Sequence, residues 1–280
     1  MKTALIQLNS GDDPTENLKQ TLGYLGQAVD QGAEFLLTPE VTNIISQSRK
    51  HQEAVLHHQD DDPTLVAIRS FAADRGVWVL IGSLALKTGD PDGRFANRSF
   101  LIDPQGGIAA WYDKIHMFDV QVTETETFRE SDGYRPGDRA VVAKADFGTI
   151  GMSICYDMRF PYLYRDLAHA GAEILTVPAA FSPVTGRAHW EALLRARAIE
   201  TGCYVLAPAQ TSPHAIAHGK PRETHGHSIA IDPWGDVLLD AGTEPGVYIV
   251  DLEPDLVAKT RQRVPSLTHD RDYSGPKDPE

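Results

Sequence analysis

The sequence predicts an α/β fold, a four-layer α-β-β-α sandwich of two mixed sheets related by an internal pseudo-repeat. Short apolar runs alternate with segments of helical periodicity, which is typical of βαβ units. In addition, segment 99–108 (SFLIDPQGGI) matches segment 228–237 (SIAIDPWGDV), with Asp-Pro-x-Gly in register. Each copy follows a strand–helix–strand–helix–strand passage. Two such halves bury one face of each sheet on the other and cover the remaining faces with helices.

The first half predicts two helices among its strands. Leucines at helical spacing follow the helix start Asp13-Pro14 and end before Gly32, and a second helix is expected over 63–75, closed by Gly76. Segment 77–86 is apolar nearly throughout, which indicates burial on both faces. Strands are expected at 3–9, 33–40, 77–86 and on both sides of the Asp-Pro-x-Gly turn at 103–106.

The second half predicts a similar succession. A strand from residue 149 ends at Cys155, and a helix resumes at Phe160 with Pro161 in its first turn. The polar segment 120–138 predicts a long surface loop. We expect one domain over 1–272 and a polar tail over 273–280. Further strands are expected at 173–178, 203–207 and around the turn at 232–235, and further helices at 186–201 and 254–264.

The composition excludes several classes of function. The chain has 280 residues, of which 41% are hydrophobic, and its formal net charge is −13. This charge argues against nucleic-acid binding, which needs a basic surface, and against docking on anionic lipid. No apolar run approaches a membrane span, and the N-terminus predicts a strand, not a signal peptide. With only Cys155 and Cys203, we expect no disulfide framework and a soluble, cytoplasmic protein.

Cys155 lies at the end of a predicted strand, directly before a helix. A nucleophile on such a sharp turn is exposed to a cleft and faces the positive end of the helix, which lowers a thiol pKa. The alternative is an inert cysteine of the core, because free cysteines are among the most buried residues. Cys155 is therefore a candidate nucleophile that needs partners.

An acyl-transfer cysteine needs a base and a group that stabilises the oxyanion. Glu40 ends the apolar run 35–39, where burial would raise the carboxyl pKa towards neutrality and suit general acid–base work. Its alternative is a capping or surface glutamate. Lys114 lies among aromatic and aliphatic residues and either stabilises an oxyanion or pairs with Asp113. We interpret His116 as a hydrogen-bonded histidine in preference to the base of a Cys–His dyad.

Three motifs together resemble the nitrilase superfamily of carbon–nitrogen hydrolases. They are Pro39-Glu40, KIHMFD at 114–119 and GMSICYDMRFP at 151–161, in that order, and the resemblance runs from about residue 3 to 272. It implies an α-β-β-α sandwich and a Glu–Lys–Cys triad without a metal or organic cofactor. Cys155 would be the nucleophile and Glu40 the general base.

The same resemblance implies the remaining catalytic groups. Lys114 and the backbone N–H of Tyr156 would stabilise the oxyanion. A further active-site glutamate maps best to Glu130, with Glu124 and Glu126 as alternatives. The resemblance also implies a homodimer or a higher homo-oligomer that acts on a small-molecule amide.

Segments 185–213 and 226–235 are similar to the Nit branch of amidases, in particular those that act on deaminated glutathione. The implied reaction releases 2-oxoglutarate and Cys-Gly. The alternatives are an ω-amidase acting on 2-oxoglutaramate, a nitrilase or N-carbamoyl amidohydrolase, and a non-enzymatic scaffold, which the filled catalytic positions disfavour. Tyr162 stands where many relatives carry Glu.

Two further positions suit a substrate with an α-keto acid. Arg159, four residues after the candidate nucleophile, offers a two-pronged donor for a carboxylate, and Thr185 would add a hydroxyl. The resemblance points to both positions. The alternatives are an Arg159–Asp157 ion pair and a helix cap at Thr185. We expect no metal site, because His189, His225 and His227 lack ligand spacing.

Overall fold

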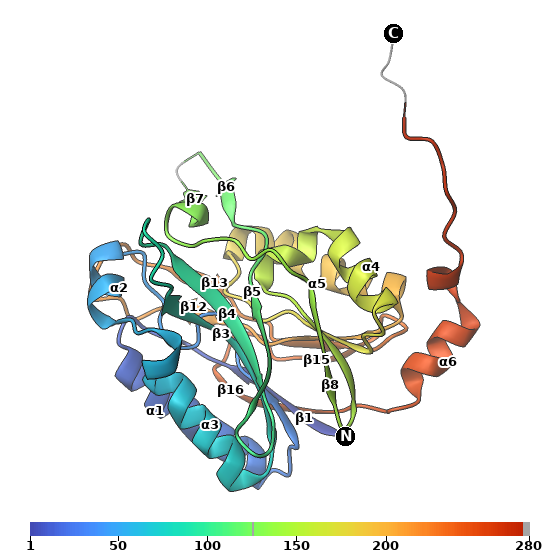
Figure 1. Ribbon diagram of the computed structural model, residues 1–280, viewed down its shortest axis with the longest axis horizontal. Helices are drawn as coiled ribbons and strands as arrows, with labels where there is room; N and C mark the ends of the chain where they lie inside the picture. The colour runs from blue at the N-terminus through green and yellow to red at the C-terminus, as the bar shows by residue number, and fades with distance from the viewer. Residues whose placement is uncertain (125, 277–280) are drawn as a thin grey trace.

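Two six-stranded sheets pack face to face between two layers of helices in the computed structural model, which describes residues 1–124 and 126–276 (Figure 1). The layers confirm the predicted α-β-β-α sandwich. Helices α1 (Pro14–Asp30) and α3 (Pro63–Arg75) cover the outer face of one sheet. Helices α4 (Pro161–His169) and α5 (Pro183–Thr201) cover the outer face of the other.

The first sheet has the order β16-β1-β2-β3-β4-β5. Its strands β1, β2 and β3 are parallel, and the other neighbours pair antiparallel. The bounds are β1 Lys2–Gln7, β2 Phe35–Leu37, β3 Trp78–Lys87, β4 Phe95–Ile102, β5 Ile108–Asp113 and β16 Gly246–Asp251.

The second sheet repeats this topology in the order β15-β14-β11-β10-β9-β8. Three parallel strands, β9, β10 and β11, are again flanked by antiparallel ones. The predicted pseudo-repeat is therefore present as two equivalent sheets. The bounds are β8 Val141–Ala145, β9 Gly148–Met152, β10 Ile174–Thr176, β11 Tyr204–Ala207, β14 Ile229–Ile231 and β15 Val237–Asp240.

The two Asp-Pro-x-Gly turns have the same hydrogen bonds. Asp103 Oδ1 accepts from the N–H groups two and four residues later, at 2.9 and 2.7 Å, and Asp232 Oδ1 does the same at 2.8 and 2.9 Å. The glycine of each turn, Gly106 or Gly235, has a positive φ of 78° or 95°, a conformation that glycine adopts without a Cβ penalty. The two copies of the repeat therefore form the same turn with the same hydrogen bonds.

Local signals set the limits of the predicted helices. The Asp13 carboxylate accepts from the N–H groups of the first turn of α1, and Gly76 ends α3 in the left-handed conformation. Helix α2 (Arg49–Val55) was not predicted, because only Gln52 of its seven residues is buried and it has no apolar stripe. Helix α6 (Leu256–Arg263) ends the folded body.

Two predictions about the second half were wrong. Segment 120–138 is not a loop throughout: β6 (Asp119–Gln121) and β7 (Thr127–Arg129) form a hairpin that a 3-10 turn follows. Helix α5 begins at Pro183 and not at 186, since proline suits the first helical position. Another small hairpin joins β12 (Thr211–Pro213) to β13 (Glu223–His225).

Side chains on the two faces of the first sheet belong to two different hydrophobic clusters. Leu5, Leu37 and Leu80 point toward the second sheet, whereas Ile6 and Ile81 pack under α1 and α3. Burial on both faces explains why β1–β3 are almost continuously apolar. This double-sided packing fixes the ends of the strands, which carry the candidate catalytic residues.

None of the helices in the described part of the chain is long and apolar enough to cross a membrane. After α6 and the short turn Ser266–Thr268, residues 269–276 are exposed. Asp270 pairs with Arg165 and His169 of α4, and the chain after it extends away from the body (Figure 1). The predicted tail at 273–280 lies partly within this segment, and residues 277–280 are outside the described part of the chain.

Replacing Asp103 or Asp232 by Ala should destabilise the fold by about 1–2 kcal/mol each, because two backbone N–H groups lose their acceptor. Urea unfolding followed by circular dichroism measures the effect. Asp103→Asn and Asp232→Asn keep the accepting oxygen and should lose clearly less. If only one of the two alanine variants is destabilised, the two turns are not energetically equivalent.

Candidate active site

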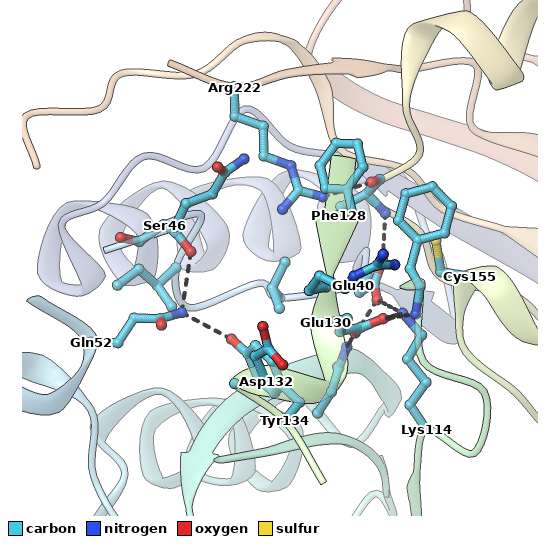
Figure 2. Close-up of a pocket in the computed structure, with 18 of the residues that line it drawn as sticks. Glu40, Ser46, Gln52, Lys114, Phe128, Glu130, Asp132, Tyr134, Cys155 and Arg222 are labelled. Atoms are coloured by element: carbon cyan, nitrogen blue, oxygen red, sulfur yellow. Dashed lines mark hydrogen bonds and ion pairs between the residues drawn. The ribbon is translucent and has the colours of Figure 1, made fainter. Parts of the chain in front are cut away.

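Glu40, Lys114 and Cys155 come together because their strands end at the same edge. Glu40 lies three residues beyond β2, Lys114 directly follows β5, and Cys155 lies three residues beyond β9. Figure 2 shows the three side chains converging with Glu130 in one cavity. Glu40, Lys114 and Cys155 are 4%, 2% and 7% exposed, so their charges interact with little screening by water.

Cys155 occupies the strand-to-helix turn that the sequence predicts. Its φ is +48°, a left-handed conformation that costs a non-glycine residue energy and is found at functional sites. Its N–H donates to the Pro178 carbonyl at 2.9 Å, and a 3-10 turn, Cys155–Arg159, leads into α4. Tyr156 lies in the first turn, where backbone N–H groups have no acceptor within the helix.

The Lys114 ammonium is held between two carboxylates. Its Nζ donates to Glu40 Oε1 at 2.9 Å and to both oxygens of Glu130 at 2.9 and 2.8 Å. Of the three glutamates considered for the position after the lysine, Glu130 is thus the one in contact with Lys114. Glu124 is exposed near the tip of the hairpin. The alternative that Asp113 pairs with Lys114 was wrong, because Asp113 binds Arg98.

Two groups that the sequence analysis missed hold the Glu40 carboxylate. Asn97 Nδ2 donates to Glu40 Oε1 at 2.9 Å, and the Ala180 N–H donates to Glu40 Oε2 at 2.8 Å. Asn97 lies in β4, beside the strand β5 that Lys114 follows, and Ala180 lies in the segment after β10. Neither residue type signals a site in a sequence. Asn97 and Ala180 contact Glu40 only because separate strands bring them beside it in the fold.

The protonation of Glu40 differs from our expectation. Burial acts to raise the pKa of this carboxyl, but the Lys114 charge and the hydrogen bonds it accepts outweigh burial, so the pKa lies below its ordinary value. The expected rise towards neutrality was wrong. The pKa of Lys114 lies well above its usual range: burial acts to lower it, but Glu130 and Glu40 outweigh burial. Both groups are therefore charged at neutral pH.

The Cys155 thiol also departs from the expectation, since its pKa is raised and not lowered. Burial and the nearby Glu40 charge disfavour the thiolate and outweigh the attraction of Lys114. The Glu40 carboxylate and the Cys155 thiol lie close enough for each to shift the pKa of the other. The resting pair is thus a thiol beside a carboxylate that can accept its proton.

The cavity above these groups has a volume of about 610 Å³. Its walls come from α2, the β6–β7 hairpin, the ends of the central strands and Arg222 (Figure 2). Arg49 and Arg129 also line it. This volume lies within the usual range for small-molecule sites.

The structure does not bring Arg159 and Thr185 into this cavity lining. Arg159 Nη2 contacts His189 Nδ1 at 3.2 Å, and its guanidinium lies 5.7 Å from the ring centroids of Tyr156 and Phe181. It does not pair with Asp157, so that alternative was wrong. Thr185 lies within the first turn of α5, and its buried hydroxyl has no hydrogen-bond partner among the described residues, which also excludes the capping alternative.

His116 is a hydrogen-bonded histidine, as predicted. Its ring nitrogens lie 2.7 Å from Asp157 Oδ1 and from the Tyr162 hydroxyl, and its ring stacks on Phe160. Asp157 also accepts from Tyr112 Oη at 2.7 Å. Because residues 112 and 116 flank Lys114 and Asp157 follows Cys155, this network ties the lysine segment to the cysteine turn.

One group in the described part of the chain has the geometry to hold a metal ion: Asp12, His51 and His218, whose ligand atoms lie within 4.8 Å of one another. These residues already bind one another, since Asp12 Oδ2 lies 3.0 Å from His218 Nδ1 and the two histidine rings stack. None of them lines the cavity. Cys155 and Cys203 are both free and buried.

Comparison with known proteins identifies relatives over almost the whole chain. The model of the carbon–nitrogen hydrolase family matches residues 2–262. A deaminated glutathione amidase of Yersinia enterocolitica is 39% identical over 269 residues, which are 96% of this chain and 92% of that protein. The NitFhit protein of C. elegans superposes with a TM-score of 0.87 at 31% identity, over 96% of this chain and 65% of that one.

A more distant solved structure is informative about chemistry. An amidase from Nesterenkonia sp. AN1 superposes with a TM-score of 0.76 at 26% identity, over 94% of each chain. In that structure, a glutamate-to-glutamine mutant carries the acetamide moiety of fluoroacetamide covalently on its active-site cysteine.

Lys114→Met should lower the free energy of unfolding by about 3–5 kcal/mol, because the buried Glu40 and the partly buried Glu130 lose their counter-charge. The lowered Glu40 pKa in the native protein stabilises the fold above the unfolded pKa, and this contribution is lost as pH falls through the folded value. Without Lys114, burial raises that pKa, so stability is lost as pH rises. Urea denaturation should therefore show greater destabilisation at pH 8 than at pH 5.

The matched control is Lys144→Met, because Lys144 is exposed on β8. Exposed charges contribute at most about 1 kcal/mol. Equal destabilisation by both variants, or a loss independent of pH, would contradict the role assigned to the buried ion pair.

Proposed function

Because the chain belongs to the carbon–nitrogen hydrolase family and is therefore a hydrolase of carbon–nitrogen bonds other than peptide bonds, we propose that it hydrolyses deaminated glutathione to 2-oxoglutarate and Cys-Gly. The observation that carries the proposal is the convergence of the buried Cys155 thiol, the ionised Glu40 and Lys114 in one cavity, where Lys114 Nζ lies 2.9 Å from Glu40 Oε1. The covalent adduct on the active-site cysteine of the Nesterenkonia amidase supports Cys155 as the nucleophile.

Acylation begins with the thiol proton. Glu40 accepts this proton while Cys155 Sγ bonds to the amide carbonyl carbon. The carbonyl oxygen becomes an oxyanion, which the Lys114 ammonium and the Tyr156 N–H stabilise. When the carbon–nitrogen bond breaks, the protonated Glu40 gives its proton to the leaving nitrogen. A thioester on Cys155 remains, and Glu40 is again a carboxylate.

Deacylation uses the same groups. Glu40 takes a proton from a water molecule, whose oxygen attacks the thioester carbonyl, and Lys114 again stabilises the oxyanion. The intermediate expels the Cys155 thiolate, which recovers a proton from Glu40, and the carboxylic acid leaves. Lys114 cannot serve as the base, because its raised pKa keeps it protonated at neutral pH. Glu130 holds Lys114 in place through both carboxylate oxygens.

The cavity supports a substrate with a large leaving group. A volume of about 610 Å³ exceeds what 2-oxoglutaramate needs, since its leaving group is only ammonia. Deaminated glutathione adds a dipeptide on the nitrogen side of the scissile bond. We therefore prefer it to the ω-amidase substrate. We keep Arg159 and Thr185 as proposed contacts of the α-keto acid, although neither lines the cavity.

Assembly into a homo-oligomer and a cytoplasmic location are part of the proposal. Tyr162 of α4 and Ile199 of α5 are 59% and 55% exposed, and Val264 after α6 is 53% exposed. Large apolar side chains exposed on helices that follow the nucleophile favour a contact with a second copy. Two unpaired buried thiols suit a reducing compartment.

Cys155→Ser should abolish turnover of deaminated glutathione and leave the folded structure intact, because the hydroxyl is a far weaker nucleophile. Product release followed by chromatography and the melting temperature provide the two measurements. Cys203→Ser is the matched control, since Cys203 is buried away from the cavity and binds the Ala172 carbonyl. Unchanged turnover in Cys155→Ser excludes this mechanism.

Glu40→Gln should stop both half-reactions, because the amide cannot accept the thiol proton or the proton of water. Intact-protein mass spectrometry after mixing with substrate should show no thioester. Rapid accumulation of the thioester in this variant would show that another group deprotonates Cys155.

The pH dependence of kcat/KM should be nearly flat from roughly pH 6 to 8.5. The lowered pKa of Glu40 places the acidic limb below its ordinary range, and the raised pKa of Cys155 places thiol ionisation above its ordinary range. Steady-state rates over this interval measure the profile. A bell-shaped curve with both limbs near neutrality would instead indicate the raised Glu40 pKa and the lowered Cys155 pKa expected from the sequence.

A further inference from the structure

Arg222 presents a guanidinium to the cavity with most of its donors unused. It lies on the loop before β13, is half-buried and lines the cavity (Figure 2). Within residues 1–124 and 126–276, the one hydrogen bond of its guanidinium is from Nη2 to the Ala180 carbonyl at 3.0 Å. An arginine has five N–H donors, and a partly desolvated cation without a carboxylate partner is unfavourable unless something else binds it.

The other arginines of the cavity differ from Arg222. Arg49 is engaged by Glu53, by two backbone carbonyls and by the Phe95 ring, whose centroid lies 3.9 Å away. Arg129 is exposed on β7. Arg222 therefore combines partial burial, permanent charge and free donors, which suits bidentate binding of a carboxylate.

The charge of Arg222 acts on the groups around it. It contributes to lowering the pKa of His214 to about 4, where burial is the larger cause. It also opposes the rise in the pKa of Tyr134, a cavity residue whose hydroxyl is buried. The cavity thus contains a positive region at Arg222, distinct from the cluster in which Lys114 lies between the Glu40 and Glu130 carboxylates.

A single residue, Ala180, links Arg222 to Glu40. The Ala180 N–H donates to Glu40 Oε2 at 2.8 Å, and its carbonyl accepts from Arg222 at 3.0 Å. In the proposed mechanism Glu40 protonates the leaving nitrogen, so the leaving group begins at Glu40. Two further residues of extended chain span about 7 Å. This length is of the same order as the path from Glu40 to Arg222, which crosses one residue and two hydrogen bonds of 2.8 and 3.0 Å.

We propose that Arg222 binds the terminal carboxylate of the dipeptide leaving group and so selects amides whose nitrogen carries an acidic peptide over simple amides. This inference rests on the proposed function and deepens it, because it names the determinant of substrate choice at the same site. Arg222 is a specificity residue that contacts the substrate and takes no part in the proton transfers.

The test compares two substrates in wild type and in Arg222→Met. On deaminated glutathione, the loss of a charged, bidentate hydrogen bond should reduce kcat/KM by about 10- to 100-fold. The loss on 2-oxoglutaramate, whose leaving group is ammonia, should be at least about tenfold smaller. In wild type, replacing the C-terminal carboxylate of deaminated glutathione by an amide should lower kcat/KM by a similar factor. In Arg222→Met the same replacement should lower kcat/KM little further, as expected when both changes remove one interaction.

Two further variants sharpen this comparison. Arg222→Lys keeps the charge without the planar fork and should recover part of the loss. Arg129→Met removes the exposed cavity arginine and should change the ratio of the two substrates by less than about fivefold. An equal loss on both substrates in Arg222→Met, or the same change of ratio in Arg129→Met, overturns the assignment.

A binding measurement separates this inference from the proposed function. Calorimetric titration should show that Cys-Gly binds wild type more tightly than its C-terminal amide does, and that Arg222→Met removes the difference. If wild type does not discriminate between the two dipeptides, the assignment to Arg222 is wrong even if deaminated glutathione is hydrolysed. If wild type hydrolyses neither amide but retains this discrimination, the proposed function fails and the Arg222 site stands.

Discussion

The buried ammonium of Lys114 is the constraint on which the rest of the site depends. A charge that is 2% exposed is tolerated only with counter-charges in contact, and Glu40 and Glu130 supply them at 2.8–2.9 Å. These carboxylates come from beyond β2 and from the turn after β7. Satisfying one lysine therefore brings three distant segments together at the edge where β5 ends. Cys155 joins them because the second sheet repeats the first and packs against it.

This ion pair also sets where the catalytic proton resides. Lys114 keeps Glu40 ionised despite burial, and the charge of Glu40, added to burial, keeps the Cys155 thiol protonated. The acidic group of the resting site is the thiol, and the base is the carboxylate. In the proposed mechanism, thiolate therefore forms only as the carbonyl is attacked. A buried ionic network thus supplies both the base and the electrostatic stabilisation of the oxyanion.

Elements outside the pseudo-repeat form the part of the cavity to which we assign substrate recognition. Helix α2, the β6–β7 hairpin and the loop ending at Arg222 have no counterparts in the two sheets, yet they form much of the cavity wall. Loops held by a rigid scaffold often carry specificity. The proposed catalytic residues lie at the strand ends, whereas the residue proposed to select the amide lies on these surrounding segments.

The sequence by itself determined the layers of the fold, the repeated turns and the strand-to-helix turn at Cys155, because periodicity, caps and turn residues are local signals. Its motifs also selected Glu40 and Lys114, and they favoured Glu130 over Glu124 and Glu126 without excluding either. Only the tertiary structure decided the protonation of Glu40 and Cys155, the contacts of Asn97 and Ala180, and which arginine faces the cavity. Each of these depends on charges and N–H groups contributed by segments distant in the chain, and burial alone, the one cue available for Glu40 in its own segment, favoured the opposite pKa direction.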